Sequence, residues 1–338
     1  MKSPSHRFRF RWPLGIVLAL LGFSAPSFAE TPHYVVGTWN LEYFKDGAKR
    51  GFPESTRKGP SYPPRTDEDY HYIAGIIQRL QIKILLLQEI NGKTIREVDR
   101  VETRSTELER LIEVLGKEDY DYVVSQSGQS QRTAILYDRR AARMNASEEM
   151  RAGEGIKVQG KQLFARQPLC AFFTFLVSGE SKNDLVVIDL HLASGESLTV
   201  NHDQAIQIVV QAIHQTSSCI PPGENDVLIA GDFNANRFDR SVEPFWNRME
   251  RTGWDVLGDR EDRYSPTRLS GVPLALRSSR LDYIIVTKGN HGLSGEEITA
   301  DAPVVHTEGL GDSPETFRRR ASDHLPVTID VAVTADND

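Results

Sequence analysis

The sequence predicts an α/β protein in which two β-sheets pack together and helices cover them from outside. The chain has 338 residues, of which 39% are hydrophobic and 26% charged, so it can bury a large core. Apolar runs of strand length outnumber the segments with helical spacing. No internal repeat or low-complexity linker divides the chain, and its polar motifs run from end to end. These observations favour one domain over two.

The first 29 residues differ from the rest. A basic stretch, an apolar stretch too short to span a membrane comfortably, and small residues ending at Ala29 follow one another there. We therefore predict a signal peptide over residues 1–29 and one catalytic domain over residues 30–338. An uncleaved anchor is the alternative, although no second apolar segment supports a membrane protein. Cleavage would give a periplasmic or secreted protein with no stable membrane anchor.

The next part of the chain predicts a loop and two helices. Residues 46–65, rich in Gly, Pro and charge, indicate an exposed insertion. Thr66 and Asp69 resemble a capping box that opens a helix ending at Leu80, with apolar residues at helical spacing. A second helix is predicted over residues 102–115, where leucines and an isoleucine share one face and a glycine follows.

Most other regular segments read as strands. They are centred near Tyr122, Ala134, Ala171, Val186, Val227, Tyr283 and Val327.

Two cysteines stand on either side of a third helical pattern. Cys170 lies in an apolar strand, and Cys219 follows the helical stretch 203–215. An exported chain meets an oxidising compartment, where such a pair can form a disulfide. The bond forms only if the fold brings the two Cα atoms within about 7 Å.

Polar side chains follow the apolar strand at residues 227–230. Gly231 frees the backbone to turn, so that Asp232 and Asn234 emerge at the carboxyl edge of the strand, where α/β proteins build sites. An ordinary Asx turn would give the same pattern.

Three further segments repeat this arrangement. Asn40 closes an apolar strand, Glu89 follows another, and Asp323 with His324 precedes a third. If Glu89, Asp232 and Asp323 shared one pocket, each pair about 4 Å apart would repel by about 4 kcal/mol at an effective dielectric near 20. Such a cluster requires a cation. Oxygen donors favour Mg²⁺, Mn²⁺ or Ca²⁺ over Zn²⁺.

At this point the chain resembles a known family. From Asn40 to His324 it is similar to the endonuclease/exonuclease/phosphatase superfamily, in its deoxyribonuclease-like branch. The resemblance implies a four-layer α/β/β/α sandwich of two mostly antiparallel sheets with flanking helices, and a metal-dependent hydrolase of phosphate esters. The motifs that carry it are "TWNLE", "LLLQEI", "IDLHLASG", "AGDFNAN", "RLDYIIV" and "SDHLPV".

The resemblance implies roles for particular residues. The metal would be held by Asn40, Glu89 and Asp323. His324 would be the catalytic imidazole, a base near pKa 6.5 that accepts a proton from water, and Asp282 would accept its hydrogen bond and fix its tautomer. An aspartate that only caps a turn is the alternative for Asp282.

The resemblance also implies catalytic residues that would contact the phosphate group of the substrate. Asp232 and Asn234 would orient water and phosphate oxygens, and His191 would stabilise charge or protonate a leaving group. His191 could also be an ordinary core histidine. Where the deoxyribonuclease-like branch has a glutamate that orients this histidine, the present chain has Gln126.

Substrate contacts are expected from Tyr122, Arg132 and Arg166, which stand in segments similar to groove-reading and phosphate-binding parts of that branch. The two arginines could instead be surface charges beside strands. Tyr122 could be a half-buried strand aromatic.

The net charge of the mature chain bears on whether it can bind a polyanionic substrate such as nucleic acid. Losing Lys2, Arg7, Arg9 and Arg11 leaves 36 basic against 47 acidic residues, a net charge of −11. This argues against tight non-specific binding of polyanions, so nucleic-acid affinity would need local basic surface. The loop 45–65 and the run 318–320 can supply it, unless they are solvated loop faces.

We therefore expect an exported, monomeric, divalent-metal-dependent phosphodiesterase that acts as a nuclease on DNA or RNA. A phosphatase or phospholipase-like enzyme for a small or lipid phosphate would share the same catalytic residues. A catalytically silent binding module is the third alternative, disfavoured because no catalytic position is visibly substituted.

Overall fold

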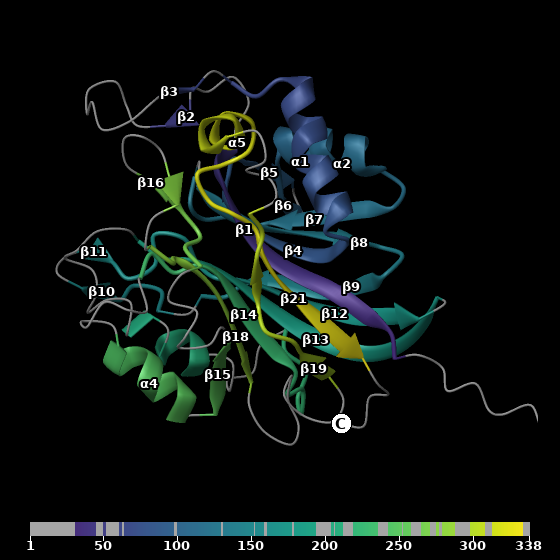
Figure 1. Ribbon diagram of the computed structural model, residues 1–338. Helices are drawn as coiled ribbons and strands as arrows, with labels where there is room; N and C mark the ends of the chain where they lie inside the picture. Colours follow the sequence, from purple (N-terminus) through teal and green to yellow (C-terminus); the bar gives the residue numbers. More distant parts are fainter. Residues whose placement is uncertain are drawn as a thin grey trace, which may run out of the picture. The chain divides into compact units, whose positions relative to one another are not determined.

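Two β-sheets packed face to face form the centre of this protein, as seen in the computed structural model (Figure 1). Ile84 on one sheet and Val187 on the other belong to the same buried apolar cluster. The segment Thr31–Asp338 groups into one compact unit. The structure describes residues 31–44, 50–51, 61–62, 64–97, 100–129, 131–151, 153–158, 161–177, 179–193, 204–205, 207–211, 219–235, 243–251, 253–257, 265–270, 275–276, 279–287, 298–307 and 313–333. The predicted signal peptide and most of the predicted insertion lie outside these ranges.

The first sheet has seven strands, and its central pair, β1 with β4, runs parallel while the other pairs are antiparallel. Its path is β19 (Ile298–Ala300), β21 (Val327–Val333), β1 (His33–Phe44), β4 (Ile82–Ile90), β8 (Arg132–Asp138) and β7 (Tyr120–Val124), with β20 (Val304–Val305) also paired to β21.

The second sheet has six strands and repeats the plan, with one parallel pair, β13 with β14, among antiparallel neighbours. Its path is β15 (Trp254–Leu257), β18 (Asp282–Thr287), β14 (Val227–Asp232), β13 (Glu180–His191), β12 (Leu169–Val177) and β9 (Ala142–Glu149). The other strands in the described residues form four two-stranded sheets: β2 (Arg50–Gly51) with β3 (Ser61–Tyr62), β5 (Lys93–Glu97) with β6 (Arg100–Arg104), β10 (Lys157–Val158) with β11 (Lys161–Gln162), and β16 (Leu269–Ser270) with β17 (Ala275–Leu276).

Helices cover the outer face of each sheet. On the first sheet, Ile73 of α1 (Asp67–Arg79), Leu111 of α2 (Thr106–Leu115) and Phe317 of α5 (Pro314–Arg320) share a buried cluster with residues of β4. On the second, Trp246 of α4 (Glu243–Arg251) packs near Tyr283 of β18, at 4.7 Å between ring centroids. Figure 1 shows the resulting helix, sheet, sheet, helix layers. The four-layer fold expected from the family resemblance is confirmed.

The predicted elements are largely present. Each of the seven predicted strand centres lies in a strand. Helix α1 begins where expected, with the Asp69 carboxylate accepting a hydrogen bond from the Thr66 amide at 3.0 Å. Of the predicted helix 203–215, the described residues 204–205 and 207–211 are helical.

One local prediction was wrong. The helix predicted from residue 102 begins only at Thr106, because Ser105 caps it by accepting from the Leu108 amide at 3.3 Å, and residues 100–104 form strand β6. The arginines at 318–320, for which a solvated loop face was the alternative to a basic surface near the site, form the last turn of α5, where cations also interact favourably with the helix dipole.

A disulfide joins Cys170 to Cys219, as the sequence allowed. Their Cα atoms are 6.3 Å apart, and both residues are fully buried among the apolar side chains under α4. The bond ties strand β12 to the segment that enters β14. None of the described helices is long and apolar enough to cross a membrane.

Candidate active site

The carboxyl ends of the two parallel strand pairs meet at one cleft of about 290 Å³. Strand β4 brings Glu89, β13 brings His191 and β14 brings Asp232. The cleft is lined by Glu42, Tyr43, Glu89, Gln131, Arg166, His191, Asp232, Asn234, Arg268, Arg318, Asp323 and His324.

Strand direction explains why distant segments meet here. Strand β18 is antiparallel to β14, so its first residue, Asp282, pairs with the last residue of β14, Asp232. In the same way β21 begins opposite the later part of β1, which leaves Asp323 and His324 just outside the sheet edge. The last residues of the parallel strands and the first residues of their antiparallel neighbours thus reach the same edge.

The backbone at this edge takes sparsely populated conformations. Gly231 has a φ of 146°, and a Cβ atom built there would lie 1.9 Å from the Leu190 carbonyl oxygen, so only glycine fits. Glu89 and Asn234 have φ values of 62° and 48°, in the left-handed region that non-glycine residues rarely adopt. Such strain clusters at functional sites.

His324 and Asp282 form the central polar pair of the cleft. The Nδ1 atom of His324 lies 2.8 Å from Asp282 Oδ2, and both side chains are buried. The backbone is held as well, because the His324 carbonyl accepts from Trp39 Nε1 at 2.8 Å and the Asp282 amide donates to Thr267 Oγ1 at 3.2 Å. The imidazole is therefore fixed with its Nε2 atom available to the cleft.

The charge state of His324 follows from the carboxylates around it. Burial alone lowers the pKa of an imidazole, but Asp282, Asp232 and Asp323 outweigh it and raise the pKa of His324 to about 10. The Nε2 atom lies 3.8 Å from Asp232 Oδ2 and 3.9 Å from Asp323 Oδ1. His324 is thus a cation at neutral pH in this structure, and the sequence expectation of a base near pKa 6.5 does not describe this state.

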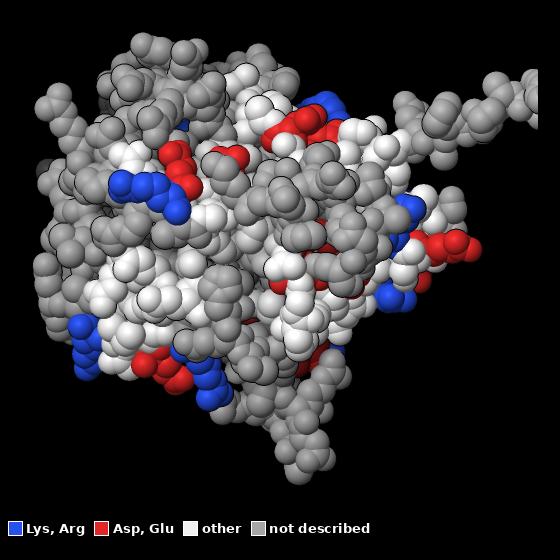
Figure 2. All heavy atoms as spheres, turned by 90° about the horizontal axis from the view of Figure 1, so that it is seen from below, with Lys and Arg blue, Asp and Glu red and all other residues white. Residues whose placement is uncertain are grey.

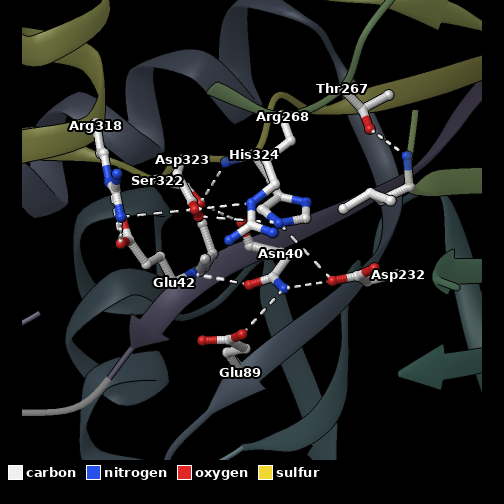
Figure 3. Close-up of polar contacts among 12 residues, drawn as sticks. Asn40, Glu42, Glu89, Asp232, Thr267, Arg268, Arg318, Ser322, Asp323 and His324 are labelled. Atoms are coloured by element: carbon white, nitrogen blue, oxygen red, sulfur yellow. Dashed lines mark hydrogen bonds and ion pairs between the residues drawn. The ribbon is translucent and has the colours of Figure 1, made fainter. Parts of the chain in front are cut away.

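Asn40 connects the two sheets across the site. Its amide nitrogen donates to Asp232 Oδ2 at 3.0 Å and to Glu89 Oε1 at 3.4 Å, while its Oδ1 accepts from the Glu42 amide at 3.0 Å (Figure 3). Ser322 Oγ donates to the Asn40 carbonyl at 2.6 Å. One amide therefore sets the separation of the two carboxylates.

The acidic groups of the cleft are electrostatically coupled. Burial raises the pKa of Glu89, and the charge of Asp323 raises it further, although the Tyr43 amide donates to Glu89 Oε2 at 2.9 Å. Burial also raises the pKa of Asp232. For Asp323, burial is outweighed by His324, Arg268 and Arg318, which lower its pKa.

These residues fit a divalent cation. Burial together with the repulsion from Asp323 disfavours the charged form of Glu89, and a nearby cation relieves both costs. Asp232, Asp282 and His324 also place three ligand atoms within 4.8 Å of one another. Because His324 Nδ1 already bonds to Asp282, we interpret that group as an acid and imidazole pair, and the oxygen donors Glu89 and Asp323, beside Asn40, are the residues that could hold a cation.

His191, the last residue of β13, lines the same cleft. Its Nε2 atom lies 3.8 Å from Asp232 Oδ2 and 4.0 Å from Glu89 Oε1. Its buried Nδ1 atom has no hydrogen-bond partner within the described ranges, consistent with Gln126 standing in place of an orienting glutamate. Burial, followed by the charges of Arg166 and His324, lowers the pKa of His191 well below its usual value, so this imidazole is neutral.

Asn234 and Arg166 also reach the cleft. The Asn234 amide donates to Asp232 Oδ1 at 2.9 Å, and its side chain donates to the Leu192 carbonyl at 2.8 Å. The structure therefore brings together all the predicted metal and catalytic residues and one of the three predicted substrate contacts.

Tyr122 and Arg132 do not line this cleft. Tyr122 lines a separate cleft beside α2, and its hydroxyl donates to the Ser105 carbonyl at 3.3 Å. Arg132 points toward the hairpin β5–β6, where it donates to Thr94 Oγ1 at 3.3 Å. A role for either residue would require a substrate that extends beyond the cleft.

The structure adds residues that sequence reasoning did not assign, among them Arg318, Arg268 and Glu42. Arg318 donates from Nε to Glu42 Oε1 at 3.1 Å and lies 3.7 Å from Asp323 Oδ2. Arg268 donates from Nε to Asp323 Oδ2 at 3.1 Å. The arginine run had marked Arg318 as being near the site, and Glu42 stands in the motif "TWNLE" although no role was assigned to it, but no pattern in the sequence marked Arg268.

Comparisons with known proteins agree with this fold. The sequence model of the Endonuclease/Exonuclease/phosphatase family matches residues 37–324. Humanized TDP2 from D. rerio is 15% identical, with a TM-score of 0.57 over 88% of this chain and 98% of that one. The mannosyl-6-phosphatase of Bacteroides thetaiotaomicron is 16% identical, with a TM-score of 0.55 over 88% and 99%.

The human Nocturnin catalytic domain is 14% identical, with a TM-score of 0.53 over 90% of this chain and 94% of that one. At these identities the solved structures establish the fold alone. No curated protein matches the sequence.

Proposed function

Because this chain belongs to the endonuclease/exonuclease/phosphatase family, whose members hydrolyse phosphate esters, we propose that it is an exported, divalent-metal-dependent nuclease that cleaves DNA or RNA. One observation carries the catalytic part of the proposal. A single cleft holds the hydrogen-bonded pair of His324 and Asp282 beside the electrostatically coupled carboxylates of Glu89 and Asp323. This combination supplies proton transfer and a cation site at the same phosphate.

The protein's own groups suggest how the proton moves. His324, held as a cation, can donate from Nε2 to an oxygen of the phosphate or of the leaving group. Asp232 lies 3.8 Å from the Nε2 atoms of both histidines, and burial raises its pKa, which makes it a suitable acceptor for the proton of an attacking water. Neutral His191 can donate a hydrogen bond without adding charge.

The metal adds charge neutralisation. When bound by Glu89 and Asp323 beside Asn40, a divalent ion would offset the negative charge that repels the nucleophile from the phosphate. The donor set favours Mg²⁺, with Mn²⁺ or Ca²⁺ as possible substitutes.

A structural neighbour supports nucleic acid as the substrate, whereas the surface charge of this protein restricts where nucleic acid could bind. D. rerio TDP2, a structural neighbour, was solved with a single-strand DNA product. On the face shown in Figure 2, described Lys and Arg side chains lie among Asp and Glu rather than in one basic patch. Binding would therefore depend on the cleft and its immediate surroundings rather than on a broad basic surface.

A phosphatase or phospholipase-like activity on a small or lipid phosphate is the second candidate. The cleft is only about 290 Å³ and is lined by three arginines, which suits a compact, highly charged phosphate. The mannosyl-6-phosphatase neighbour supports this reading.

A substrate panel tests the proposal. The purified mature protein is incubated with plasmid DNA, RNA, chromogenic phosphodiester and monoester substrates, and phospholipid vesicles, each with Mg²⁺ or EDTA. Cleavage of nucleic acid that EDTA abolishes supports the nuclease, and activity on the monoester or lipid alone selects the second candidate. If no substrate is cleaved, the protein is a binding module rather than an enzyme. The His324→Ala protein, purified in parallel, controls for contaminating nucleases.

The proposal also includes export as a monomer. Cleavage near Ala29 would leave Glu30 as the first residue, which N-terminal sequencing of protein from the periplasm or medium can determine. An intact Met1 on active cellular protein would reject export. Light scattering on the same sample gives the oligomeric state.

A further inference from the structure

The three arginines that line the cleft differ in how many of their donors are already used. Arg166 donates from its two terminal nitrogens to the His191 carbonyl at 3.2 Å and to Gln131 Oε1 at 2.8 Å. Arg318 is 5% exposed and donates from Nε to both carboxylate oxygens of Glu42, at 3.1 and 3.2 Å. Both guanidinium groups are thus engaged in holding protein atoms.

Arg268 is engaged at one end only. Its Nε atom donates to Asp323 Oδ2 at 3.1 Å, and within the described ranges its terminal nitrogens make no hydrogen bond. The side chain is 34% exposed and lies beside Asp323 and His324 in the cleft (Figure 3). A guanidinium fork fixed at Nε and open at its two ends is suited to two oxygens of a phosphate group.

The backbone holds Arg268 in place. The Arg268 residue forms a β-bridge with His324, and the amide of Leu269 donates to the Asp323 carbonyl at 2.7 Å. On the other side, Thr267 Oγ1 accepts from the Asp282 amide at 3.2 Å. These hydrogen bonds join the backbone around Arg268 to the backbone of His324 and Asp282, so the position of Arg268 relative to them is fixed before substrate binds.

Its charge is also secured. An arginine guanidinium remains charged throughout the working range of pH.

We propose that Arg268 binds the non-bridging oxygens of the phosphate group that is cleaved, through its two terminal nitrogens. This inference deepens the proposed phosphoesterase function and names its phosphate ligand. Diesters offer two such oxygens and monoesters three, so Arg268 would bind either class. Arg166 lines the same cleft but its terminal nitrogens already donate to protein atoms, and Arg132 lies outside the cleft.

Inorganic phosphate is the probe, because its binding does not depend on turnover. Titration calorimetry in Mg²⁺ compares the wild type with Arg268→Met, which removes the charge and the fork, and with Arg268→Lys, which keeps the charge beside Asp323. Arg143→Met is the matched control, since Arg143 is exposed and stands near the opposite end of the sheet, opposite Thr174 of β12. Thermal unfolding of each variant shows that it is folded.

Phosphate affinity should fall about ten- to a hundredfold in Arg268→Met, and Arg268→Lys should recover only part of it. The Arg143→Met protein should bind as the wild type does. Equal affinity in the wild type and Arg268→Met, whether both bind or neither does, overturns the assignment. So does full recovery by Arg268→Lys, because charge alone would then be sufficient.

Hydrolysis is measured separately on the chromogenic diester and monoester. If the wild type hydrolyses an ester and Arg268→Met keeps its kcat/KM, the inference fails while the proposed function stands. If no ester is hydrolysed but phosphate binding is lost in Arg268→Met, the phosphate site stands and the enzymatic function fails.

Discussion

The proton on His324 depends on side chains from three separate segments of the chain. Asp282 holds Nδ1 at 2.8 Å, and the carboxylates of Asp232 and Asp323 lie within 4 Å of Nε2. The imidazole can therefore act only with these acids in place, and the group behaves as a unit. Single substitutions in such a unit cost nearly as much as removing all of it.

We expect His324→Ala to lower turnover at least about a hundredfold, the lower end of what a general acid or base contributes. The measurement is kcat on the best substrate of the panel, with the unfolding midpoint measured alongside. Asp282→Asn should also be slow, since the amide would disturb the tautomer and lose the charge that holds the imidazole. A His324→Ala enzyme with wild-type turnover would remove His324 from the mechanism.

The raised pKa of His324 also predicts how the stability of the metal-free protein depends on pH. The pKa of an unfolded histidine is about 6.5, and in the folded protein it is raised to about 10. The folded state thus binds this proton more tightly, so its stabilising contribution is complete below about pH 6.5 and is lost as the pH rises through about 10.

Urea unfolding in EDTA at about pH 6 and about pH 9.5 measures this effect. The wild type should lose more unfolding free energy across the interval than His324→Gln, which has no proton to lose. The other titrating groups are present in both proteins, so their contributions cancel when the two losses of unfolding free energy are compared. Equal losses would show that the imidazole is not stabilised as a cation.

Residue types at strand ends could be predicted from the sequence, but charge states could not. Asp232 and Glu89 stand out because each follows an apolar run. The cationic state of His324 depends on how closely three carboxylates approach it after folding. Arg268 gave no signal, because its partner Asp323 is 55 positions away in the sequence and its own segment is neither a strand end nor a motif.

At the level of elements, the two parallel pairs β1–β4 and β13–β14 determine where the site lies. Their apolar runs, such as residues 227–230, could be recognised because strands buried on both faces are almost continuously hydrophobic. Which strands pair could not be read from the same pattern, since it does not specify partners. The late start of α2 was missed because Ser105, rather than the apolar spacing, decides where that helix begins.

The disulfide between β12 and the segment before β14 should contribute substantially to stability. It closes a loop with a sequence separation of 49, for which the chain-entropy relation gives about 4 kcal/mol. We expect a reductant to lower the urea midpoint of the wild type. The Cys170→Ala/Cys219→Ala variant should start near the reduced value and not respond to reductant. A midpoint unaffected by reductant in the wild type would indicate that the bond adds no stability.

At the level of the whole molecule, polar contacts join the two sheets at the site. Asn40 of β1 reaches Asp232 of β14, and Gln88 of β4 donates to Asp189 of β13 at 2.7 Å in the buried interface. Burial raises the pKa of Asp189 well above its usual value. The family fold could be inferred from the order of the motifs, but these contacts between sheets depend on a packing that no single segment encodes.

A cation bound by Glu89 and Asp323 should stabilise the whole fold. Metal that binds only the folded protein adds about 2.7 kcal/mol when its concentration is a hundred times the dissociation constant. In the absence of metal the ionised Glu89 is unfavourable, because burial and Asp323 raise its pKa. Glu89→Gln should therefore unfold in EDTA at least as late as the wild type, yet gain much less stability from Mg²⁺.

Thermal unfolding in EDTA and at increasing Mg²⁺ concentrations tests both expectations for Glu89→Gln. The control is Glu154→Gln, because the Glu154 side chain is 66% exposed and lies outside the cleft. The control should follow the wild type in both conditions. If Glu89→Gln is stabilised by Mg²⁺ as much as the wild type, the ion does not bind at Glu89. If it is destabilised in EDTA, the carboxylate serves the fold itself rather than a cation. The ion is placed at Glu89, where the edges of the two sheets meet, only if Glu89→Gln is as stable as the wild type in EDTA and gains little stability from Mg²⁺.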